Sequence, residues 1–154
     1  METPTKCPEC GSEMKVTSAT EKVTYKGEAV EVPNVSALRC AECGEAIITG
    51  EASVQLNDAF KELRARVEGV LAPRQVASIR TALGMTQRQA AMVLGGGKNG
   101  FQKYESGEQV PSRAMSVLLL VLSERPELKT KVEEFATKLE ETAHHERAFD
   151  HALS

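Results

Sequence analysis

Apolar residues in the second half of the chain recur every three or four positions, which is typical of helices that pack on one side. Four positions of the first such stretch, residues 74–83, are expected to face inward: Val76, Ile79, Ala82 and Leu83. Gly84 is expected to end this helix, and Ser112 is expected to cap a later one. The pattern therefore predicts a cluster of short helices.

The stretch from Thr86 to Gly107 reads as two short helices joined by a tight turn. Thr86 is the expected N-cap of the first helix, and Gln89 three positions later completes a capping box. Three consecutive glycines, residues 95–97, end this helix because glycine is unfavourable in a helix interior and adopts left-handed conformations easily. This is the plan of a helix-turn-helix, which places its second helix in the major groove of DNA.

The second helix of the pair is predicted to begin near Lys98 or Asn99. Phe101 and Tyr104 share its inner face, while Asn99, Gln102 and Lys103 share the outer one. Asn can pair with adenine and Lys can donate to guanine, so Asn99 and Lys103 are the candidate base readers. The alternative is that Asn99 only caps this helix and Lys103 is a solvated charge.

Charge is unevenly distributed, although the whole chain carries a formal net charge of −3. Between Pro73 and Leu122 six basic residues face only Glu105 and Glu108, which suits a phosphate-binding surface. Six cations in fifty residues are not exceptional by themselves. The six basic residues are Arg74, Arg80, Arg88, Lys98, Lys103 and Arg113. The remaining candidates for contact with DNA, mostly at phosphates, are Arg74, Gln87, Arg88, Lys98, Gln102 and Arg113.

The first half of the chain shows a different periodicity. Between Lys15 and Arg39 polar and apolar residues alternate in places, which predicts an antiparallel hairpin or three short strands with a turn at 26–28. Five residues then recur at helical spacing between 51 and 68: Val54, Leu56, Phe60, Leu63 and Val67. Residues 69–73, which combine a glycine and a proline, are the expected linker between two domains.

Two near copies of one five-residue motif, Cys-x-x-Cys-Gly, flank the predicted hairpin. They place Cys7 and Cys10 before it and Cys40 and Cys43 after it. Two such pairs supply four thiolates for one tetrahedral zinc ion, and a site filled by four sulfurs has no open position for catalysis. We expect one structural Zn²⁺ per chain and no enzyme activity. A pair of disulfides, four free thiols or a thioredoxin-like redox pair are the alternatives.

The helix that Ser112 is expected to cap is unusually apolar from Met115 to Leu122. This helix is expected either to pack on its own copy in a homodimer or to form the core of a five-helix domain. Pro126 opens a last helix with a narrow apolar seam, which fits packing on the domain or a coiled-coil contact. His144, His145 and His151 are better explained as a solvated tail than as a metal site.

The chain of 154 residues has 41% hydrophobic residues, enough for one ordinary domain or two small ones. Its longest apolar run, Val117 to Leu122, is too short to cross a bilayer, and the first residues lack the apolar segment of a secretory leader. We therefore expect a cytoplasmic protein that does not contact membranes.

The motifs together resemble known proteins. Gln87, Ala91, the glycine turn and Tyr104-Glu105-x-Gly107 resemble the helix-turn-helix of Xre/Cro-family repressors. The segment GGGKNGFQKYESG, after a four-cysteine zinc module of the YgiT type, is closer still to the MqsA antitoxins. This resemblance extends from about Lys6 to Lys131. It implies that Asn99 reads bases, with Lys103 where well-known members carry Arg, and that the acidic zinc module binds a small basic ribonuclease toxin.

The sequence thus predicts an α+β protein, with a small zinc-bound β module followed by an all-α, five-helix Xre/Cro-type domain. The expected boundaries are 1–68 for the zinc and toxin-binding module, 69–73 for the linker, 74–131 for DNA binding and dimerisation, and 132–154 for a helical extension. The expected function is an antitoxin that represses its own operon on palindromic operator DNA as a homodimer. A stand-alone zinc-containing regulator without a toxin is the alternative.

Overall fold

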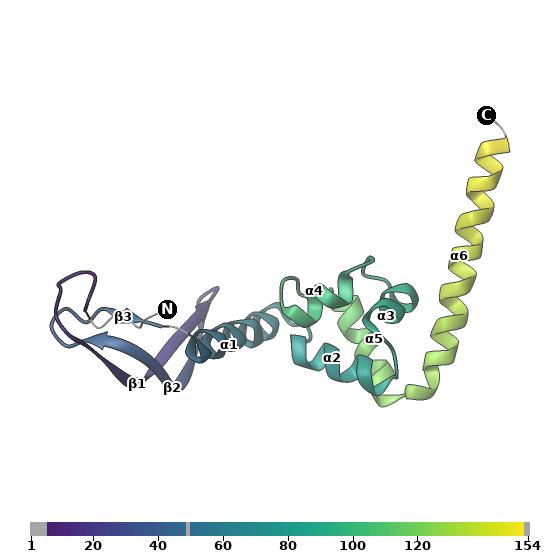
Figure 1. Ribbon diagram of the computed structural model, residues 1–154. Helices are drawn as coiled ribbons and strands as arrows, with labels where there is room; N and C mark the ends of the chain where they lie inside the picture. Colours follow the sequence, from purple (N-terminus) through teal and green to yellow (C-terminus); the bar gives the residue numbers. More distant parts are fainter. Residues whose placement is uncertain (1–5, 49, 153–154) are drawn as a thin grey trace. The chain divides into compact units, whose positions relative to one another are not determined.

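The computed structural model describes residues 6–48 and 50–152, with side chains described up to residue 143 (Figure 1). The chain divides into two compact units, residues 1–67 and 68–154. The first is built around a sheet, and the regular elements described in the second are all helices, which confirms the predicted α+β class. No helix in the described part of the chain combines the length and apolarity that crossing a membrane requires.

The first unit contains a three-stranded antiparallel sheet in the order β1-β2-β3. Strands β1 (Met14–Tyr25) and β2 (Glu28–Cys40) form a long hairpin, and β3 (Ala46–Ile47) adds a short edge to β2. Lys26 and Gly27 turn the chain with φ values of 47° and 84°, at the predicted turn. The register pairs Met14 with Cys40, so the hairpin brings the two cysteine motifs together.

Helix α1 (Glu51–Glu68) follows the sheet, as predicted. Ala52 and Leu56 of α1 pack with the strand residues Val32 and Val35, and the Phe60 ring meets the Tyr25 ring edge-on at 5.6 Å. Val54, one of the five apolar residues at helical spacing, is nevertheless 60% exposed. A second small cluster joins Cys7, Met14, Leu38 and Cys40, with Ile47 packed against it.

The second unit begins with α2 (Pro73–Ala82), α3 (Gln87–Leu94) and α4 (Gly100–Ser106). These are followed by α5 (Arg113–Glu124), a short 3₁₀ helix (Pro126–Leu128) and α6 (Lys129–Ala152). One cluster of ten buried side chains joins the elements: Leu71, Val76, Leu83, Met85, Ala90, Phe101, Tyr104, Met115, Leu119 and Leu122. A single shared core therefore holds this unit.

The predicted helix ends are mostly found. Thr86 accepts a hydrogen bond from the Gln89 backbone and Gln89 returns one to the Thr86 backbone, which confirms the capping box. Ser112 caps α5 through the Met115 backbone. The prediction that Ala82 faces inward is wrong, since it lies exposed in the last turn of α2. Helix α4 also begins slightly later than predicted, at Gly100.

The segment expected to link the two domains is partly anchored. Leu71 and Ala72 are buried, and the Leu71 backbone N–H donates to the Ser116 hydroxyl of α5 at 3.1 Å. The chain is therefore fixed to the helical unit from Leu71 onward.

Candidate metal centre and nucleic-acid interface

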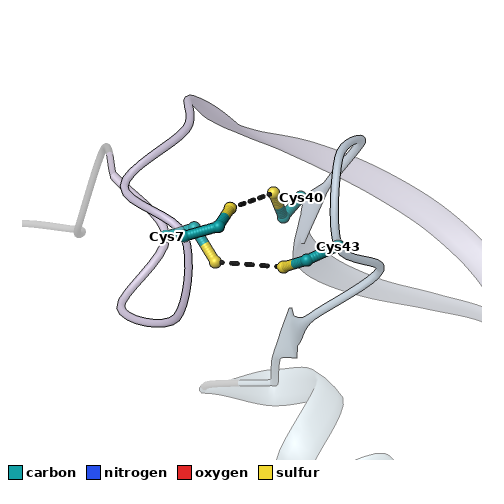
Figure 2. Close-up of side chains that lie close together, drawn as sticks. Cys7, Cys40 and Cys43 are labelled. Atoms are coloured by element: carbon teal, nitrogen blue, oxygen red, sulfur yellow. Dashed lines mark hydrogen bonds between the residues drawn. The ribbon is translucent and has the colours of Figure 1, made fainter.

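The four cysteines lie together at the base of the hairpin. Their sulfur atoms all fall within 4.8 Å of one another. Cys7 Sγ lies 3.5 Å from Cys43 Sγ, and Cys10 Sγ lies 3.4 Å from Cys40 Sγ, so each close contact joins one motif to the other (Figure 2). These separations are well beyond the S–S bond of about 2.05 Å, and the cysteines are not disulfide-bonded.

The two cysteine motifs adopt the same backbone conformation. The Gly11 N–H donates to the Cys7 carbonyl at 2.9 Å, and the Gly44 N–H donates to the Cys40 carbonyl at 3.1 Å. Both glycines are left-handed, with φ values of 75° and 79°. Each motif therefore needs its glycine to close the turn and bring its two sulfurs to one side.

The sulfur cluster fits a tetrahedral zinc ion. Zn–S bonds of about 2.3 Å hold four sulfurs about 3.8 Å apart, close to the separations observed here. Cys7 and Cys40 are buried and Cys10 and Cys43 are exposed, so the cluster lies at the edge of the small apolar core. With four sulfur ligands, such an ion would cross-link the two motifs and leave no position for a substrate.

Protons are held unevenly within the thiol cluster. Side-chain and backbone hydrogen bonds from Ser12 lower the pKa of the Cys10 thiol to about 6. A hydrogen bond from the Glu45 backbone lowers the pKa of the Cys43 thiol. Contact with the Cys7 thiol and desolvation outweigh this effect and raise that pKa to about 12. Crowded thiols resist a second ionisation, and a dication removes this conflict by binding the thiolates.

Five of the eight predicted DNA-contacting residues meet in the helical unit. They line one surface hollow of about 210 Å³: Gln87, Arg88, Lys98, Asn99 and Gln102. Its lining residues come from the N-terminal ends of α3 and α4, so both helices of the motif contribute to the hollow. The other three candidates, Arg74, Lys103 and Arg113, do not line it; Arg74 and Arg113 are exposed near the starts of α2 and α5.

The two candidate base readers occupy different positions on α4. Asn99 is the N-cap residue and is exposed, yet its side chain makes no capping hydrogen bond to the described helix. Lys103 lies one turn later, and its Nζ is 3.4 Å from Glu108 Oε1. Phe101 and Tyr104 are buried on the inner face, as predicted. Helix α4 thus presents its polar side outward.

The turn between the two helices depends on glycine. Gly95, Gly96 and Gly97 have φ values of 87°, 95° and 84°, a run that side chains rarely permit. A Cβ atom on Gly96 would also lie 2.9 Å from the Tyr104 hydroxyl. The Tyr104 side chain therefore packs against the turn and sets the approach of α4 to α3.

A partly buried ion pair, which the sequence did not reveal, ties the motif to α2. Arg80 donates to both carboxylate oxygens of Glu105, at 2.5 and 3.0 Å, and to the Met85 carbonyl at 2.7 Å. The Gln87 amide donates to the same carboxylate at 2.9 Å. Glu105 and Arg80 are only 11% and 17% exposed in their side chains. No spacing signal links residues 25 positions apart in a single sequence.

These contacts determine the ionisation of Glu105. Burial alone would raise the pKa of Glu105, but the hydrogen bonds from Arg80 and Gln87 outweigh it and hold this pKa below its usual value. The hydrogen bonds to Glu105 and the charge of this carboxylate raise the pKa of Arg80 in turn. Arg80 is thus engaged inside the unit, and its expected contribution to the basic surface is largely cancelled by Glu105.

The acidic residues of the first unit are mostly exposed. Glu28, Glu31, Glu42 and Glu45 are exposed, whereas Glu21 is half-buried and bonded to Arg39. The side chains of His144, His145 and His151, considered above as a metal site, lie outside the described residues.

Two comparisons identify relatives. The profile of a family described as "Antitoxin component of bacterial toxin-antitoxin system, MqsA" matches residues 5–133. The protein "Antitoxin MqsA" from Escherichia coli strain K12 is 32% identical over 129 residues, which cover 82% of this chain and 98% of that protein. The family match spans both the sulfur cluster and the helix-turn-helix.

Proposed function

Because the chain belongs to the MqsA family of antitoxins, we propose that it represses its own operon by binding operator DNA and neutralises a toxin through its first unit. We further propose that it acts in the cytoplasm as a non-enzymatic homodimer. One structural zinc ion would be held by Cys7, Cys10, Cys40 and Cys43.

The main support for the DNA-binding proposal is the hollow between α3 and α4. It gathers Arg88 and Lys98, which suit phosphate, with Asn99 and Gln102, which suit base edges. The buried Phe101 and Tyr104 fix the helix that presents them. A dimer of such units would read two half-sites about 34–36 Å apart, which suits a palindromic operator.

The acidic first unit supports the toxin-binding proposal. Its exposed glutamates would attract a small basic protein, and the rigid zinc site would keep the hairpin in one shape before the partner binds. A toxin would then bind without first having to order this surface. The stand-alone regulator remains the second candidate, because an acidic surface is also compatible with simple solvation.

Titration of labelled operator and random DNA would test the DNA-binding proposal. Asn99→Ala is expected to weaken operator binding by about 1–3 kcal/mol while changing random binding little, because it removes a base contact. Arg88→Ala is expected to weaken both DNAs alike and to lower the salt dependence by about one unit of slope. Equal losses on both DNAs for Asn99→Ala would exclude base reading by this residue.

Co-purification with the product of the neighbouring gene would separate the two candidates. A stable complex with a product that is toxic on its own is expected, and the complex should weaken when exposed glutamates such as Glu31 and Glu45 are changed to Gln. Intact operator binding without any such partner would favour the stand-alone regulator.

A further inference from the structure

The C-terminal part of α6 has no counterpart in the matched family region, which ends at residue 133. Before that point α6 packs on its own unit: Val132 lies against the shared core, and Lys129 and Glu133 lie beside α3. After it, Phe135 and Leu139 are 51% and 73% exposed. A helix segment without packing is only marginally stable in water, so this stretch needs a partner surface.

The exposed side chains form a narrow seam with two different flanks. Phe135 and Leu139 are four residues apart on one face of α6. Lys138 lies on one flank, with its Nζ 5.8 Å from the centre of the Phe135 ring. The opposite flank has the small Ala136 and Ala143, and Glu140 lies just beyond them. The seam thus has lysine directly on one flank and small alanines on the other, with Glu140 beyond the alanines and Glu134 and Glu141 beyond the lysine.

This arrangement is complementary to itself in one orientation. When two copies of the helix pair in parallel, the lysine flank of each meets the alanine and glutamate flank of the other. Lys138 can then reach over a small alanine toward Glu140 of the second copy. An antiparallel pair would place lysine against lysine and glutamate against glutamate, which is unfavourable.

We propose that residues 134–143 of α6 pair in parallel with the same segment of a second copy of this chain, through Phe135 and Leu139. Two exposed apolar residues are too few for a free-standing coiled coil. The pairing therefore rests on the proposed homodimer, in which the helical units already hold the two chains together at high effective concentration. It lengthens that dimer contact beyond the family's shared region.

Cysteine cross-linking of the full, zinc-loaded chain tests the orientation. In a parallel pair residue 139 faces its own copy, so Leu139→Cys is expected to give a covalent dimer on mild oxidation. Thr137→Cys is the matched control, because residue 137 lies on the opposite face of α6. The unmodified chain reports any background from its four native cysteines. Equal cross-linking of both variants, or none, would overturn the proposal.

Charge exchange supplies a test that does not depend on cysteine. Lys138→Glu is expected to weaken dimerisation about tenfold, measured by sedimentation equilibrium, because it places glutamate opposite glutamate. Adding Glu140→Lys to the Lys138→Glu variant should restore dimerisation. The helix content of both variants, measured by circular dichroism, should stay unchanged. No effect of Lys138→Glu would contradict the parallel pair. A dimer that lacks the Leu139 cross-link would overturn only this inference, whereas a chain that stays monomeric would also contradict the proposed homodimer.

Discussion

The two units of this chain hold their folds by different means. The first has two small apolar clusters, one of which includes the cysteines, and its long hairpin is otherwise largely exposed. The second has one cluster of ten buried side chains drawn from all of α2 to α5. A small sheet with little core depends on a cross-link, whereas packed helices do not. Damage to one unit should therefore leave the other folded.

Removal of the proposed zinc ion should have the largest effect. Structural zinc contributes on the order of 10–16 kcal/mol to the folding of small zinc modules, so a strong chelator or Cys40→Ser should unfold the first unit. The strand signal in circular dichroism should be lost while the helical melting transition persists. Ser18→Ala, a change on the exposed hairpin surface, is the control. A first unit that stays folded without zinc would contradict the idea that this unit depends on a metal cross-link whereas the helical unit does not.

Phe101→Ala should produce the converse effect. Phe101 is completely buried in the shared core of the helical unit, and truncation of such a ring costs about 3–5 kcal/mol. Urea unfolding followed by helix signal should show this loss, while zinc affinity, measured by competition with a chromophoric chelator, should not change. Reduced zinc affinity would mean that the two units are coupled.

Glu105 gives the second unit a pH dependence of its own. Its pKa is lowered in the folded state, so its stabilising contribution is present above the unfolded pKa of about 4.3 and is lost as pH falls through the lower folded value. Glu105→Gln should cost about 2 kcal/mol at neutral pH and flatten the acid limb of the unfolding curve. Glu108→Gln, at an exposed ion pair, should change stability little.

The smallest effect is expected at the glycine turn. Gly96→Ala and Gly97→Ala both force alanine into a left-handed conformation, at about 1–2 kcal/mol each. Only Gly96→Ala also crowds the Tyr104 hydroxyl, so it should be the more destabilising of the two in thermal unfolding. Tyr104→Phe should reduce the difference, and equal losses would mean that Tyr104 does not control this turn.

Local signals predicted much of this molecule. The capping box at Thr86, the glycine turns and the cysteine spacing each depend on neighbouring residues, and all were found as predicted. Burial of single residues was less predictable, as Ala82 and Val54 show, because a helix face is chosen by distant packing partners.

The contacts between distant residues could not be predicted. The Arg80–Glu105 pair and the anchoring of Leu71 by Ser116 join positions far apart in the sequence, and only the folded chain brings them together. Gln87 illustrates the consequence: it was predicted to contact phosphate, and its amide is engaged with Glu105. Whether it also contacts DNA stays a prediction.

The triple-glycine turn has a consequence for how this sequence can vary. Three adjacent residues with φ values between 84° and 95° exclude nearly every other amino acid, whatever space surrounds them. A saturation mutagenesis map of the helical unit should therefore show an unbroken intolerant band at residues 95–97. The exposed outer face of α4 beside it should accept many replacements for folding, so evolution can change what α4 contacts without changing how it is held.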